Sequence, residues 1–173
     1  MRNIVTAVLV FLACAAPAAG ADLVYLNTPQ GAERLVTAKL RDQFFAVQPY
    51  VETQQNLAFC GPASLAAVLN SLDIPRPDVG PLYPYTYFTQ DNVFTAATQR
   101  IKSYIGVSSQ GMTLAEIAAF GQRLGVAAER YYGDALGLEQ LRSLIATALS
   151  HPDRRLIVNY SRQPLGQAGA GHL

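Results

Sequence analysis

Apolar residues recur at helical spacing in several stretches of the chain. The clearest stretch is residues 60–72, where Leu65, Val68, Leu69 and Leu72 repeat every three or four positions and prolines follow. A Thr113–Glu116 capping-box pattern opens another helix, which Gly125 ends. Together these patterns predict helices over residues 35–45 (weakly), 60–72, 91–105, 113–124 and 138–149.

Two shorter segments have the pattern of strands. Residues 126–132 and 155–161 are rich in β-branched and aromatic side chains, and the second has an apolar centre, as expected of a buried strand. Prolines deny regular structure to the tyrosine-rich segment 75–87, and glycines make 166–171 a flexible tail. Because helices predominate early and strands late, the pattern predicts an α+β fold.

The first 21 residues have the pattern of a secretory signal. Arg2 precedes an apolar run over residues 4–13, and Ala19–Ala21 fits a cleavage site, so the mature chain would be a single domain over residues 22–173. The run is too short for a stable membrane span. We therefore expect an exported protein, in the periplasm. A lipid anchor at Cys14 is the lesser alternative, because the residues before it match a lipoprotein signal poorly.

Composition excludes several classes of function. Half of the residues are hydrophobic, which rules out a largely disordered chain. The formal net charge is +1, and no basic stripe or cationic amphipathic face indicates nucleic acid or a membrane surface as partner. After signal removal Cys60 is the one remaining cysteine, so neither an internal disulfide nor a cysteine-histidine zinc cluster can form.

Cys60 is the first candidate for chemistry. It stands where a helix is predicted to begin, and the free N–H groups and partial positive charge of a helix N-terminus favour thiolate over thiol. Gly61 permits close approach of the backbone, and Pro62 suits the first helical turn. The alternative is a cysteine packed as a small hydrophobe, and this stretch alone does not decide between the two.

A thiol nucleophile needs a base and an oxyanion donor. His172 follows a glycine-rich turn after an apolar strand, whereas His151 follows a helix end, where a solvated histidine is common. A terminal histidine is otherwise merely exposed. Gln54 stands six residues before Cys60, where papain-like enzymes have a glutamine whose amide contributes to the oxyanion hole. A lone glutamine at this place would otherwise be an ordinary surface residue.

The chain resembles the catalytic domain of phytochelatin synthases, above all the short bacterial and cyanobacterial forms. The matching motifs occur in order with compatible spacing over about 120 residues, so the resemblance is highly specific. They are Ala58-Phe59-Cys60-Gly61 with Val68-Leu69-Asn70-Ser71-Leu72, Phe88-Thr89-Gln90-Asp91-Asn92-Val93-Phe94, Gln110-Gly111-Met112-Thr113-Leu114, Ile157-Val158-Asn159-Tyr160-Ser161-Arg162, and Gly166-Gln167 leading to Gly171-His172.

This resemblance implies a papain-like (cysteine proteinase) fold, with a helical part followed by an antiparallel sheet, and a Cys-His-Asp triad that includes Cys60 and His172. It implies a glutathione γ-glutamylcysteinyltransferase, an acyltransferase that releases glycine and holds γ-Glu-Cys as a thioester on Cys60. The short forms look more like hydrolases that yield γ-Glu-Cys. The family acts in heavy-metal detoxification. Cadmium or zinc enters as a glutathione thiolate complex, with no tightly bound cofactor implied, and a homodimer remains open.

The chain departs from the family pattern after the histidine. The family's aspartate belongs to strands beyond it, but no acidic residue follows His172 here, and the last acid is Asp153. We therefore expect a domain that is incomplete at its C-terminus and slow or inactive. Two alternatives to the enzyme stay open: a non-catalytic remnant that binds thiols, and a papain-like cysteine peptidase.

Overall fold

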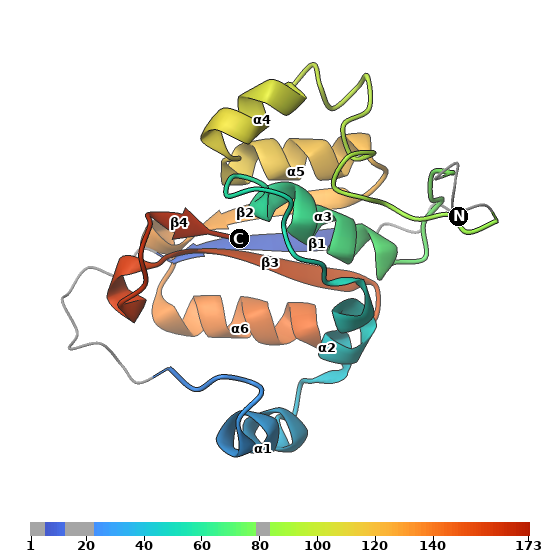
Figure 1. The fold of residues 1–173 in the computed structure, drawn as a ribbon. Coiled ribbons are helices and arrows are strands. Elements are labelled where there is room, and N and C mark those ends of the chain that lie inside the picture. The colour runs from blue at the N-terminus through green and yellow to red at the C-terminus, as the bar shows by residue number, and fades with distance from the viewer. Residues whose placement is uncertain (1–5, 13–22, 79–83) are drawn as a thin grey trace.

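A four-stranded mixed sheet runs through the molecule (Figure 1). The computed structural model describes residues 6–12, 23–78 and 84–173, the first of these ranges by its backbone. Spatial order is β2-β1-β3-β4. The strands are β1 (Thr6–Leu12), β2 (Ala127–Tyr132), β3 (Arg154–Ser161) and β4 (Gly171–His172).

The sheet corrects one part of the predicted fold class. β3 and β4 are antiparallel as expected, but β1 is parallel to both β2 and β3. The physical reason is the connection between β2 and β3: a helix of 12 residues carries the chain back along the sheet, so both strands run in one direction. The α+β class is confirmed, whereas the papain-like fold stays a prediction.

Helices cover both faces of this sheet in the described part of the chain (Figure 1). Helices α3, α4 and α5 lie on one side, and α2 and α6 lie on the other. Their bounds are α1 (Pro29–Thr37), α2 (Asp42–Val47), α3 (Cys60–Asn70), α4 (Tyr104–Gln110), α5 (Leu114–Arg123) and α6 (Leu138–Leu149), with 3-10 turns η1 (Gln48–Tyr50), η3 (Gly133–Ala135) and η4 (Gln163–Leu165). No helix among the described residues is long and apolar enough to cross a membrane.

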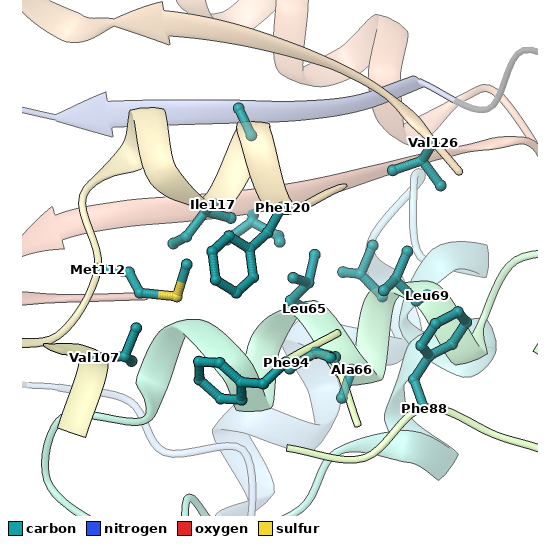
Figure 2. Packing of buried hydrophobic residues seen from close by; sticks show 14 of the residues in the cluster. Leu65, Ala66, Leu69, Phe88, Phe94, Val107, Met112, Ile117, Phe120 and Val126 are labelled. Atoms are coloured by element: carbon teal, nitrogen blue, oxygen red, sulfur yellow. The ribbon is translucent and has the colours of Figure 1, made fainter. Parts of the chain in front are cut away.

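The core lies between α3, α5 and the sheet (Figure 2). The predicted apolar face of α3 is buried there, and Phe59 and Phe120 are fully enclosed. Gly61 allows α3 to approach the segment before α5, because a Cβ at this position would lie 3.0 Å from the Met112 sulfur. The core therefore fixes the helix that begins at Cys60.

Four predicted elements agree closely with the structure. α5 begins after Thr113 with the capping box that the sequence predicts. The predicted strand at 126–132 is β2, and the predicted strand at 155–161 is β3. α6 coincides with the predicted helix at 138–149.

Two predicted helices are wrong in extent. Residues 91–102 form turns rather than a helix, because the Thr98 hydroxyl donates to the Val93 carbonyl and the Thr95 hydroxyl accepts from the Thr98 N–H. Such local side-chain bonds compete with the helical ladder. The weak helix predicted at 35–45 is interrupted between α1 and α2, where Ala38 is extended.

Part of the predicted signal segment has a place in the sheet. β1 lies between β2 and β3 and pairs with both. Cys14 and the predicted cleavage site at Ala21 lie outside the described residues. The structure thus shows the segment in the uncleaved chain, and its removal stays a prediction.

Candidate active site

Cys60 is the first residue of α3, as predicted, and its side chain is partly exposed. Phe59 precedes it without a side-chain cap, and Pro62 lies in the first turn. At this helix start the N–H groups of Cys60 and Gly61 have no helical partner, whereas Pro62 has no N–H and the Ala63 N–H donates to the Phe59 carbonyl at 3.0 Å. A thiolate or a developing oxyanion is favoured at such a helix end.

Two cavities meet at Cys60. The larger, about 700 Å³, is bounded by Cys60, Met112, Asn159 and His172. The smaller, about 310 Å³, runs along α3 and is lined by Gln54, Cys60 and His172 together. The structure thus brings the three predicted site residues to the walls of one cavity, although 112 positions in the sequence separate the thiol from the imidazole.

Gln54 lies on an extended stretch that a buried side chain holds in place. Gln90, 1% exposed, accepts from the Gln55 N–H at 2.9 Å and donates to the Thr53 carbonyl at 3.0 Å. Gln54 itself donates through Nε2 to the Asn56 carbonyl at 2.7 Å. An amide nitrogen has two hydrogens, so one remains for an oxyanion. The reasoning from sequence missed Gln90, although it lies within the motif 88–94.

His172 is held on β4 beside Tyr160. The two residues are register partners, and their rings meet edge to face with centroids 5.9 Å apart. Burial lowers the pKa of His172, and the nearby Arg162 guanidinium lowers this pKa further. The imidazole is therefore neutral at pH 7, the form that accepts a proton. In the described part of the chain no hydrogen bond joins this imidazole to Cys60, although both residues line the same cavity.

Asp153 lies far from this base. It precedes β3, whereas His172 pairs with Tyr160 near the other end of that strand. Tyr160 stands seven positions after Asp153, which along a strand is a span of roughly 23 Å. Asp153 therefore cannot orient the imidazole in this arrangement.

Asn159 is a second residue that the reasoning from sequence did not single out. It lines the larger cavity, and its Oδ1 is buried without a hydrogen-bond partner. A buried acceptor without a hydrogen bond lowers stability by about 1–3 kcal/mol. A ligand whose donor pairs with the Asn159 Oδ1 would therefore be bound more favourably. Position alone could have suggested it: on β3, Asn159 alternates in phase with the core residue Ile157.

The described residues contain no group of three His, Cys, Asp or Glu side chains that could hold a metal ion. The chemistry that the cavity around Cys60 offers is nucleophilic. It combines a thiol at a helix N-terminus, an amide donor and a neutral imidazole around one cavity.

Comparison with known proteins decides the family. The family model described as phytochelatin synthase matches residues 17–173. The chain belongs to the phytochelatin synthase family. The resemblance seen in the sequence is thereby confirmed.

Plant enzymes are among the curated relatives of this family member. The chain is 30% identical over 150 residues to glutathione gamma-glutamylcysteinyltransferase 3 of Lotus japonicus, and this alignment covers 84% of the chain and 30% of the relative. It is 30% identical over 131 residues to glutathione gamma-glutamylcysteinyltransferase 1 of Triticum aestivum, covering 75% and 25%. Enzyme 2 of Arabidopsis thaliana is 28% identical over 131 residues, covering 75% and 27%. The chain thus spans less than a third of the length of these relatives.

Proposed function

We propose that the protein is a glutathione γ-glutamylcysteinyltransferase that works through a thioester on Cys60. The cavity shared by Gln54, Cys60 and His172 carries this proposal, because it collects a nucleophile, a donor and a base in one place. Family membership and the printed names of the plant relatives support glutathione as substrate.

In the first half-reaction, His172 takes the thiol proton and the Cys60 sulfur attacks the carbonyl carbon of the Cys–Gly bond. The C–N bond breaks, and the imidazolium returns its proton to the leaving glycine amine. The lowered pKa of His172 supports its role as base, since the neutral ring is present when the thiol must lose its proton.

Gln54 and the N-terminal N–H groups of α3 would stabilise the oxyanion. One oxyanion-hole donor typically contributes about 3 kcal/mol to the transition state. The hydrogen bond from Gln54 to Asn56 fixes the amide beforehand, so little reorganisation is needed. Gln90 acts one step further away, by holding the stretch on which Gln54 lies.

In the second half-reaction, an amine or water attacks the thioester carbon, the C–S bond breaks and the Cys60 thiol is regenerated. A second glutathione would give a phytochelatin, and water would give γ-Glu-Cys. We propose that hydrolysis dominates. Leu57, which lines the larger cavity, is 98% exposed, so bulk water borders the site where the thioester would form.

Cadmium or zinc would enter as the thiolate complex of glutathione and thus as part of the substrate. Export to the periplasm, with signal removal after Ala21, is part of the same proposal and rests on the N-terminal sequence pattern. Lipidation at Cys14 is the lesser alternative, and a homodimer remains open.

Incubation with glutathione and assay of released glycine tests the function. The proposal expects glycine release that Cys60→Ser abolishes, with γ-Glu-Cys as the main product. A cysteine peptidase would instead cleave an ordinary α-linked peptide in preference to glutathione. A thiol-binding remnant would instead exchange with oxidised glutathione, giving a mixed disulfide at Cys60 and one free glutathione, without releasing glycine. Either of these results would contradict the proposal.

A further inference from the structure

A third cavity, about 620 Å³, lies at the C-terminal end of α3, away from Cys60. Tyr50, Tyr85 and Tyr87 line it together with Arg76 and Glu52. The proposed function does not use this cavity.

Arg76 is held firmly on the wall of this cavity. Its Nη2 donates to the Asn70 carbonyl at 2.7 Å, at the negative end of the helix dipole, and its guanidinium carbon lies 5.9 Å from the Tyr50 ring centroid. The charge is nevertheless unmatched, because no carboxylate among the described residues forms a salt bridge with it.

The guanidinium also has donors to spare. Nη1 makes no hydrogen bond within the described ranges and is the donor open to a ligand, whereas Nε is buried without a partner. A positioned guanidinium with open donors, beside aromatic rings, suits a carboxylate better than any neutral group. Arg76 therefore marks the cavity as a site for a ligand with a free carboxylate.

This cavity adjoins the one that contains Cys60. Val51 and Glu52 line both, and the smaller cavity runs along α3 through Ala63 and Val68. The 11 residues of α3 span roughly 16 Å. A tripeptide with one γ-linkage extends about as far as four ordinary residues, roughly 14 Å, so its two ends can approach the two cavities.

We propose that Arg76 binds the C-terminal carboxylate of the acceptor, a γ-glutamyl thiol peptide that runs along α3 with its amine toward Cys60. This inference rests on the proposed function. Glu52, on the shared wall, accepts from Gln90 at 3.3 Å and offers its carboxylate to the ammonium end of the peptide. The ammonium first loses one proton to solvent, and the resulting amine attacks the thioester carbon. The C–S bond then breaks, the Cys60 sulfur leaves as thiolate, and the imidazole takes the second proton from the new amide nitrogen.

The ratio of transfer to hydrolysis tests this site without altering the protein. Glutathione and glutathione amidated at its glycine carboxylate give the same thioester, releasing glycine or glycinamide, so any difference in the ratio comes from the acceptor. We expect the amide to lower the ratio about tenfold, the scale of one lost charge-assisted contact. If the ratio of transfer to hydrolysis is the same with glutathione and with amidated glutathione, the proposed site is wrong. It is also wrong if the parent enzyme only hydrolyses the thioester.

Variants of Arg76 give the second comparison. Arg76→Gln should show the low ratio with both acceptors, and Arg76→Lys should recover part of the ratio with glutathione. Arg100→Gln, which removes an exposed arginine outside these cavities, should keep the parent ratio. If Arg76→Gln keeps the parent ratio while glycine release is normal, the Arg76 site alone is refuted. If the parent releases no glycine, the proposed function fails and the acceptor site fails with it.

Discussion

Gln90→Ala should loosen the stretch that carries Gln54 while leaving Cys60 in place. The Gln90 side chain is 1% exposed and joins the loop after residue 87 to residues 52–55 by three hydrogen bonds. Truncation leaves the Gln55 N–H and the Thr53 carbonyl without these partners and opens a small cavity. The catalytic effect should therefore appear in the oxyanion donor and not in the nucleophile.

The size of the effect follows from these contacts. Two lost bonds to the backbone contribute about 1 kcal/mol each, and the unfilled volume adds about 1 kcal/mol more. We expect the free energy of unfolding to fall by about 2–3 kcal/mol. Loss of one oxyanion donor would lower kcat by up to about 10²–10³.

Urea denaturation measures the first quantity, and glycine release at a temperature where the variant is folded measures the second. Gln122→Ala is the matched control, because Gln122 is exposed and makes one longer bond, 3.3 Å to the Ala128 carbonyl. If Gln90→Ala costs no more stability than the control, the proposed tether is wrong. If stability falls but kcat does not, Gln54 does not depend on this tether.

Three further predictions concern the walls of the site. Because burial and Arg162 lower the pKa of His172, the acid limb of the pH profile of glycine release should lie below the free-histidine value of about 6.5, and Arg162→Gln should move this limb to higher pH. The unfolded chain binds a proton at His172 more readily than the folded chain does. The free energy of unfolding should therefore fall as the pH drops below about 6.5. An Arg162→Gln profile identical to the parent's would contradict this. Gly61→Ala should lower the free energy of unfolding, measured by thermal unfolding, by about 1 kcal/mol, because the clash of the new methyl group with Met112 outweighs the gain in helix propensity. A stabilised variant would show that α3 and Met112 are not packed this closely. Asn159→Leu should raise KM while leaving the melting temperature unchanged or higher, since it removes an unpaired acceptor; an unchanged KM would exclude Asn159 from substrate binding.

Local sequence predicts those elements whose signals are themselves local. The capping box at Thr113 and Glu116 fixes the start of α5, and regular apolar spacing defines α3 and α6. The segment 91–102 misleads, because its helical spacing is overruled by hydroxyl contacts at Thr95 and Thr98. β1 illustrates a different difficulty, since a short apolar run suits a strand as well as a signal segment.

The candidate site divides in the same way. Cys60 and Gln54 can be identified from the sequence, because Cys60 begins a predicted helix and Gln54 stands six positions before it. Gln90, Asn159 and Arg76 are not, because their importance comes from partners, or missing partners, that only the folded chain brings near. The parallel pairing of β1 likewise depends on where α6 returns the chain.

The thioester on Cys60 is the central claim, and intact-protein mass spectrometry after an acid quench tests it most directly. With glutathione, the account predicts a γ-Glu-Cys adduct on the parent protein, mapped by peptide analysis to Cys60 and absent from Cys60→Ser. Glycine release without an adduct under conditions that preserve thioesters, or an adduct that persists in Cys60→Ser, would contradict it.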